Sequence, residues 1–228
     1  MTAFKILSWN VRGLKDRKKR RSIFRHIHVK YPQHFAVLQE THSTPDCEQC
    51  WRSEWGSNVL FSHGSNLSKG VCILVPRGFG SSAEILNCGT CLVGGRALFV
   101  KLNLNNIVFK VLGLYAPTHP TSEQVDFFTN VKALLNAQDD LSNLIIAGDL
   151  NVHLSDLDVD RAQRRTRRPA EVMNETINEL GLMDVWRHFN PGKARFTWRR
   201  RNPFQQSRID YFIISETISC VNKVEKCV

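Results

Sequence analysis

The chain has 228 residues, of which 42% are hydrophobic and 23% charged. This composition is typical of a folded globular protein and excludes a disordered tail. Apolar runs such as Val71–Val75 are far shorter than the roughly 20 residues of a membrane span, and no signal peptide pattern opens the chain. Seven cysteines, an odd number, fit a reducing compartment better than a disulfide framework. We expect one domain over residues 1–228, without membrane association.

The net charge of +10 is unevenly distributed. Lys15–Arg21, Arg161–Arg168 and Arg195–Arg201 hold 15 of the 31 lysine and arginine residues. Concentrated positive charge of this kind attracts a polyanion, most often nucleic acid. A role in solubility or as a localisation signal is the alternative for any single segment. Three segments together favour a nucleic acid-binding face.

Short runs of β-branched and aromatic residues, mostly bounded by Gly, Pro, Asn or Ser, predict strands. In chain order these runs are Phe4–Trp9, Phe35–Leu38, Val71–Val75, Ala97–Leu104, Ile107–Tyr115, Leu144–Ala147, Arg195–Trp198 and Ile209–Ile214. Apolar residues at three-to-four spacing predict helices over residues 17–31, from Thr121 through Leu135, and over 169–180 before Gly181. Many strands with a few interspersed helices indicate a layered α/β domain.

Several of these strands end in a polar residue, and an acidic group at the end of a buried strand is unfavourable unless something pairs with it. A hard cation such as Mg²⁺ would offset that cost through oxygen ligands. Taken singly, each residue has a structural alternative: Asn10 could cap a turn, Glu40 could pair with an arginine, and Asp149 could simply follow a strand. One metal-bearing pocket explains all of them together. The residues concerned are Asn10, Glu40, Tyr115, Asp149, Asn151 and Asp210.

Five motifs in this order resemble those of the exonuclease/endonuclease/phosphatase superfamily. They are Ser8–Gly13, Leu38–His42, Tyr115–Pro117, Gly148–Asn151 and Ser207–Tyr211. Within the superfamily, Gln39–Ser43, Phe196–Trp198 and Arg161–Arg168 are most similar to the apurinic/apyrimidinic endonuclease-like domains of LINE (non-LTR) retrotransposons. The resemblance implies a DNase I-like fold, a four-layered α/β sandwich of two mostly antiparallel sheets flanked by helices.

The resemblance also implies an activity. The enzyme would use Mg²⁺, with Mn²⁺ as a substitute, to nick one strand of double-stranded DNA at a retrotransposon target site. The nick would leave a 3′-hydroxyl that primes reverse transcription. It further implies a nuclear location and a reverse transcriptase on the same full-length polyprotein.

The same resemblance assigns roles to the residues at the strand ends. Glu40 would be the main metal ligand, with Asn10 beside it. Asp149 would orient or deprotonate the attacking water, and Asn151 would hold that water or a phosphate oxygen. Tyr115 would touch the scissile phosphate, and Asp210 would orient a catalytic histidine.

A further set of residues is expected to contact DNA. The segment Arg199–Gln206 would form a hairpin loop, and the resemblance implies that this loop enters the minor groove. Arginine suits that narrow, electronegative surface, and Phe204 could wedge between base steps. Nonspecific attraction of phosphates is the alternative for its three arginines. The full expected set is Arg12, Thr118, His119, Arg164, Arg165, Arg199, Arg200, Arg201, Phe204 and Ser207.

The family's last motif, Ser-Asp-His, does not occur in the chain. The last of the chain's eight histidines is His188. We therefore expect an endonuclease domain cut before that motif, lacking its C-terminal strands and weak or inactive in nicking. Two other functions stay open: a DNA-binding module without turnover, and a phosphodiesterase on the same scaffold that acts on abasic DNA or another phosphoester.

Two smaller patterns carry less weight. Cys47-x-x-Cys50 and Cys88-x-x-Cys91 could form a zinc site, but the gap between the pairs is longer than usual. The acidic stretch Asp156–Asp160 resembles a calcium loop, yet Arg161 stands where glycine is needed. We interpret that stretch as a solvated loop.

Overall fold

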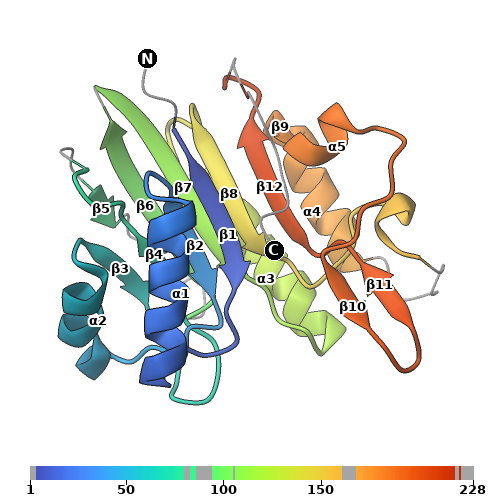
Figure 1. Ribbon diagram of the computed structural model, residues 1–228. Helices are drawn as coiled ribbons and strands as arrows, with labels where there is room; N and C mark the ends of the chain where they lie inside the picture. The colour runs from blue at the N-terminus through green and yellow to red at the C-terminus, as the bar shows by residue number, and fades with distance from the viewer. Residues whose placement is uncertain are drawn as a thin grey trace.

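A computed structural model describes residues 4–79, 83–85, 94–104, 106–160, 168–218 and 221. Its elements form four layers, with a helical layer on each side of two packed β-sheets (Figure 1). The fold class expected from the sequence is therefore confirmed.

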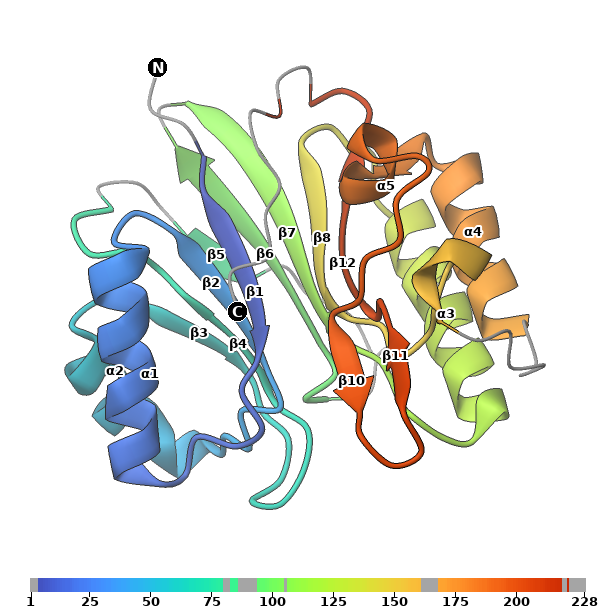
Figure 2. The same cartoon turned by 45° about the vertical axis from the view of Figure 1, so that its right-hand side comes forward.

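The first sheet has four strands in the order β1-β2-β4-β3. Strands β1 and β2 are parallel, and the other neighbours are antiparallel. Helices α1 and α2 cover the outer face of this sheet (Figure 2). The bounds are β1 Ile6–Asn10, α1 Arg17–Lys30, β2 Phe35–Gln39, α2 Glu48–Trp55, β3 Val59–Ser62 and β4 Val71–Leu74.

The second sheet has six strands in the order β5-β6-β7-β8-β12-β9. Only β7 and β8 are parallel in it. Helices α3 and α4 cover its outer face, and a separate hairpin, β10–β11, precedes β12. The bounds are β5 Ala83–Ile85, β6 Ala97–Leu104, β7 Ile107–Tyr115, α3 Thr121–Asn136, β8 Leu144–Asp149, α4 Arg168–Glu179, β9 Leu182–Asp184, α5 Val185–Phe189, β10 Trp198–Arg200, β11 Gln205–Ser207 and β12 Asp210–Ser215.

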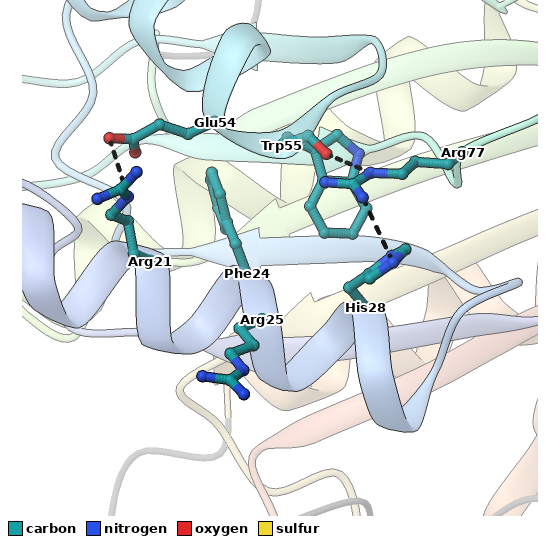
Figure 3. A pocket seen from close by; sticks show the side chains of 7 residues that line it. All are labelled: Arg21, Phe24, Arg25, His28, Glu54, Trp55 and Arg77. Carbon is teal, nitrogen blue, oxygen red and sulfur yellow. Dashed lines mark hydrogen bonds and ion pairs between the residues drawn. The ribbon is translucent and has the colours of Figure 1, made fainter.

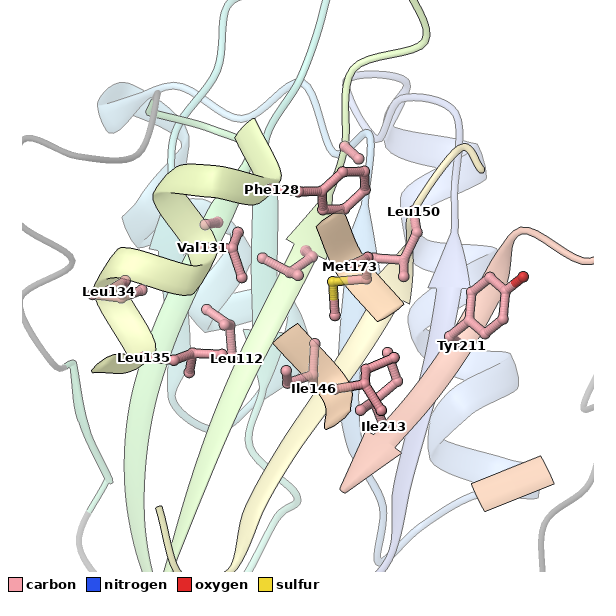
Figure 4. Packing of buried hydrophobic residues seen from close by; sticks show 14 of the residues in the cluster. Leu112, Phe128, Val131, Leu134, Leu135, Ile146, Leu150, Met173, Tyr211 and Ile213 are labelled. Carbon is pink, nitrogen blue, oxygen red and sulfur yellow. The ribbon is translucent and has the colours of Figure 1, made fainter. Parts of the chain in front are cut away.

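Three apolar clusters hold the layers together, because each sheet must bury both of its faces. One lies between α1, α2 and the first sheet, and another lies between the two sheets. In the third, Phe128 of α3 and Met173 of α4 pack on Leu112, Ile146 and Ile213 of the second sheet (Figure 4). Each such fully buried side chain contributes about 1.5–3 kcal/mol.

Local signals account for the helix ends. Asp16 caps α1, since its carboxylate accepts a hydrogen bond from the Lys19 backbone N–H at 2.7 Å. Pro169 lies in the first turn of α4, a position where its missing N–H has no cost, and Gly181 follows with a φ of +58°.

The predicted strand Arg195–Trp198 is wrong in its position, because the strand begins at Trp198 and continues to Arg200. Thr197 lies just before it and uses its hydroxyl oxygen to accept hydrogen bonds from the backbone N–H groups of Ile209 and Asp210. The shortest elements, β5, β9 and β11, have too few residues to show a periodicity. Among the described residues, no helix has the length and apolar character that crossing a membrane requires.

Candidate active site at the strand ends

The polar residues at the strand ends meet at one edge of the molecule. Parallel pairing sends the ends of β1 and β2 to this edge, and the same holds for β7 and β8. Tyr115 ends β7 directly opposite Asp149, which ends β8. On the other side of β8, antiparallel β12 begins at Asp210, whose register partner is also Asp149. Topology alone therefore brings together residues from distant parts of the chain.

Asn10 joins the two sheets through its side-chain amide. Its Nδ2 donates to Glu40 Oε1 at 2.7 Å and to Asp149 Oδ2 at 2.9 Å. Its Oδ1 accepts from the Arg12 backbone N–H at 3.1 Å. In this orientation Asn10 presents a donor, and not a metal-binding oxygen, to the two carboxylates; turning the amide over would exchange the two atoms.

Asp149 is 5% exposed. Its Oδ1 accepts the Asn151 backbone N–H at 3.0 Å. Burial first, and then the negative charges of Asp210 and Glu40, raise the pKa of Asp149 to about 7. Gly148 before it is required by space, because a Cβ there would lie 1.9 Å from the Leu114 carbonyl oxygen.

Tyr115 completes this group from β7. Its hydroxyl forms a hydrogen bond with Glu40, and burial together with the nearby carboxylates raises the pKa of Tyr115, so the phenol stays protonated. The Arg96 guanidinium lies 5.4 Å from the centroid of the Tyr115 ring. Arg96 is a cation beside the site that the sequence analysis missed, because it stands alone, outside the basic segments.

Asn151 lies beside Asp149 with its side chain turned to the backbone. Its Nδ2 donates to the Ala116 carbonyl oxygen at 2.8 Å. Like Arg12, Glu40 and His42, Asn151 has a positive φ, close to +50°. Non-glycine residues adopt such φ values rarely, and they concentrate where surrounding contacts impose the backbone. Four such residues in the loops at one edge indicate a constrained backbone conformation, which secondary-structure propensities do not predict.

The carboxylates fit a hard divalent cation. Within the described residues, neither Glu40 nor Asp149 forms an ion pair with a lysine or arginine. The described part of the chain has no cluster of three or more His, Cys, Asp and Glu arranged to hold a metal. Magnesium retains several waters and needs only one or two carboxylates, so Glu40 with Asp149 nearby meets its requirement. Zinc at Cys47 and Cys50 is not tested, because the other pair, Cys88 and Cys91, lies outside the described residues.

The described residues among those expected to contact DNA lie in loops and in a hairpin at or beside this edge. Arg12, Thr118 and His119 are exposed in the loops that follow β1 and β7. The β10–β11 hairpin projects from the same end of the molecule (Figure 2). It exposes Arg199, Arg200, Arg201 and Phe204, while Ser207 at its base is partly buried. Arg164 and Arg165 lie outside the described residues.

Not every residue of the basic segments serves this surface. Arg20 is 5% exposed, and its Nε donates to Glu54 Oε2 at 2.7 Å. Its Nη1 donates to the Leu14 carbonyl oxygen at 2.9 Å. Arg20 therefore anchors α1 to α2 from a buried position, whereas Lys18 and Lys19 beside it are exposed.

The interpretation of residues 156–160 as a solvated loop is wrong for Asp158. Asp158 is completely buried, and its two carboxylate oxygens accept from Arg208 Nε at 2.8 Å and Nη2 at 3.0 Å. Arg208 also binds Asp184, and Arg187 binds Asp158. This buried charge network ties the segment before α4 and the start of α5 to the connection between β11 and β12. Its partners are far apart in sequence, so local patterns could not reveal it.

The chain resembles known proteins in sequence and in fold. The profile of the Endonuclease/Exonuclease/phosphatase family matches residues 7–224. A 149-kDa protein of transposon TX1 from Xenopus laevis is 35% identical over 182 residues, which are 79% of this chain and 14% of that protein. Exodeoxyribonuclease III of Haemophilus influenzae is 25% identical over 249 residues, covering 98% of this chain and 90% of the enzyme.

Two solved structures illustrate the likeness of fold. The AP endonuclease LMAP of Leishmania major has a TM-score of 0.75 at 17% identity, covering 94% of this chain and 80% of the other. The endonuclease domain of TRAS1, a telomere-specific non-LTR retrotransposon, has a TM-score of 0.66 at 15% identity, covering 94% and 86%. At these identities the likeness concerns the fold alone.

Proposed function

The chain belongs to the Endonuclease/Exonuclease/phosphatase family, and we propose that its site cuts a phosphodiester bond in one strand of double-stranded DNA with the help of Mg²⁺. One observation carries the proposal: Glu40 and Asp149, from different sheets, share the Asn10 amide at 2.7 and 2.9 Å. Two carboxylates that share one amide donor, without a pairing lysine or arginine among the described residues, form a site suited to a cation and a phosphate.

Glu40 would hold Mg²⁺, with Asn10 beside it after its amide turns over, and Mn²⁺ could replace the ion. The bound ion would supply positive charge to a phosphate oxygen. Asp149 would orient a water molecule and accept its proton as the water oxygen bonds to phosphorus. The bond from phosphorus to O3′ then breaks, and the departing O3′ takes up a proton from solvent water to become a hydroxyl.

The other residues at the edge position the phosphate. Tyr115, held protonated, can donate a hydrogen bond to a phosphate oxygen, and Asn151 can hold the water or a second oxygen. Arg96 adds positive charge next to Tyr115. Asp210, opposite Asp149 in the strand register, is the residue to which the resemblance assigns the orientation of a histidine.

The likeness to the TX1 protein favours a retrotransposon origin. The nick would then leave a 3′-hydroxyl primer for reverse transcription in the nucleus. The chain spans 14% of that relative's length, so most of the longer protein lies outside the match. We place a reverse transcriptase on the same polyprotein as part of this proposal.

Supercoiled plasmid provides the direct test. Because the chain lacks the Ser-Asp-His motif, we expect only slow conversion to open circles with Mg²⁺, and none with EDTA or with the Asp149→Ala variant. Binding of the plasmid without Mg²⁺-dependent nicking would instead favour a DNA-binding module without turnover. Duplexes with one abasic site, tested in parallel, separate the other alternative, because an abasic-site enzyme would cut them and leave intact duplex uncut.

A second prediction concerns the three exposed arginines of the β10–β11 hairpin, Arg199–Arg201. Replacing all three by alanine should weaken duplex binding and lower the slope of log affinity against log salt by about 0.9 for each phosphate that the hairpin no longer neutralises. Fluorescence anisotropy between low and physiological salt measures both quantities. If affinity and slope stay constant and only the cutting position moves, the hairpin reads sequence and does not hold phosphates.

A further inference from the structure

Helix α1 is a polycation whose far end lies away from the candidate active site. It carries nine Lys, Arg and His residues and no Asp or Glu between Arg17 and Lys30. Ile23, Phe24 and Ile27 are buried, as is Arg20, and most of the other charged residues lie on the exposed side of the helix. The first turn lies at the edge of the candidate active site, where β1 and β2 end; we call it the catalytic edge. The helix then runs for about 21 Å along the outer face of the first sheet (Figure 2).

A cavity of about 280 Å³ opens between α1 and α2 along this path. We call it the α1 cleft. Arg21 and Glu54 lie at one end and His28 and Arg77 at the other, with Phe24 between them (Figure 3). Arg25 extends from α1 next to Phe24 (Figure 3).

The α1 cleft has more positive than negative groups. Its one carboxylate, Glu54, is already bound by Arg20 at 2.7 Å and Arg17 at 3.3 Å. At the other end, Arg77 donates through Nε to the Trp55 carbonyl oxygen at 2.8 Å, and its Nη1 lies 3.4 Å from His28 Nε2. Within the described residues, Arg25, His28 and Arg77 form no ion pair with a carboxylate. An anionic ligand would supply the negative charge that these side chains lack as a partner.

The cleft offers charge but little apolar surface. Phe24 and Trp55 are only 3% and 2% exposed, so neither ring can receive an apolar anchor from a protein partner. Guanidinium groups match the oxygens of a phosphate in a two-pronged geometry. A row of phosphates fits these features better than an acidic peptide does.

The direction of α1 decides which nucleic acid can use the cleft. Duplex DNA is stiff over about 150 base pairs, so a duplex lying on the catalytic edge cannot also turn along α1 without a costly bend. A single strand is flexible and can follow the helix. We propose that the α1 cleft binds single-stranded polynucleotide, DNA or RNA, through its phosphates. This inference rests on the proposed function, because the path begins at the edge where duplex DNA would be cut.

Anisotropy with labelled oligo-dT and oligo-U tests the inference on the whole chain. In the Arg25→Gln/Arg77→Gln variant we expect affinity to fall about 5–20-fold, and the log affinity to log salt slope to decrease by about 1.4, or 0.7 per neutralised single-strand phosphate. Since Arg77 also holds Trp55, the single Arg25→Gln variant gives an independent reading, with an expected decrease of about 0.7. Binding of either oligonucleotide supports the inference, and comparison of oligo-dT with oligo-U shows whether the cleft binds DNA or RNA.

The control variant Lys101→Gln/Lys193→Gln removes the same charge from exposed positions outside the cleft. Equal affinities and slopes in the two double variants would overturn the inference. So would complete displacement of oligo-dT by an excess of uncleavable hairpin duplex in EDTA, since the single strand would then occupy the catalytic edge. If the chain binds polyglutamate through Arg25 and does not bind the oligonucleotides, the inference is wrong, and the cleft instead binds an acidic protein partner. Plasmid nicking, measured on the same preparations, reports separately on the proposed function.

Discussion

Replacing Asp149 by asparagine should reduce plasmid nicking at least about 10³-fold and at the same time raise the melting temperature measured without divalent metal. The activity falls because asparagine cannot accept the water's proton. The stability rises because the substitution removes a buried negative charge, and burial first, then the charges of Asp210 and Glu40, already raise the pKa of Asp149 to about 7. The Asn10 amide can turn and accept a hydrogen bond from the new side chain.

Removing that charge should be worth on the order of 1–3 kcal/mol, a rise of roughly 3–8 °C for a domain of this size. Calorimetry in EDTA and in Mg²⁺ measures the effect. The wild-type chain should gain stability from Mg²⁺, and the variant should gain much less. Asp126→Asn, at an exposed position on α3, is the matched control and should change neither quantity. A variant that nicks like the wild type, or melts earlier in EDTA, would contradict this account of the site.

The largest loss of stability is expected from Asp158→Ala. Asp158 is completely buried and binds both Arg208, 2% exposed, and Arg187. Without the carboxylate both guanidinium groups keep their charge, Arg187 loses its ion pair, and Arg208 retains only the one with Asp184. Breaking a buried ion pair on one side costs about 3–5 kcal/mol, or roughly 10 °C in melting temperature. Chemical denaturation measures the free energy of unfolding.

The hairpin should respond as well. The Arg208 backbone N–H donates to the Asp158 carbonyl oxygen at 2.7 Å, and the Asp160 N–H donates to the Gln206 carbonyl at 3.1 Å. Loosening this contact should weaken the dependence of DNA binding on the hairpin arginines. Glu171→Ala is the control, because its ion pair with Arg168 at 3.5 Å is half exposed and should be worth less than about 1 kcal/mol. A loss below 1 kcal/mol for Asp158→Ala would show that the network contributes little to stability.

The sequence predicts the layers and the residues at the strand ends well, because both depend on local patterns. Long alternating runs such as Ala97–Leu104 and Ile107–Tyr115 are strands with the predicted bounds. Asn10, Glu40 and Asp149 stand out because each interrupts or follows an apolar run.

What the sequence could not show depends on contacts across the fold. The orientation of the Asn10 amide follows from a neighbour 139 positions away. Asp158 resembles a solvent-exposed acid until Arg208, 50 positions later, packs against it. The positive φ of Glu40 is imposed by hydrogen bonds between backbone segments, in which Gly13 N–H donates to the Glu40 carbonyl oxygen.

The Asn10 bridge has a consequence for how activity arises during folding. Each carboxylate belongs to its own sheet, and one amide from the N-terminal strand is hydrogen-bonded to both. Neither half of the polypeptide can assemble this arrangement alone, whatever secondary structure it has formed. The arrangement that we propose to be catalytic therefore forms only after the two sheets have docked against each other, and a chain that stops before β8 lacks it.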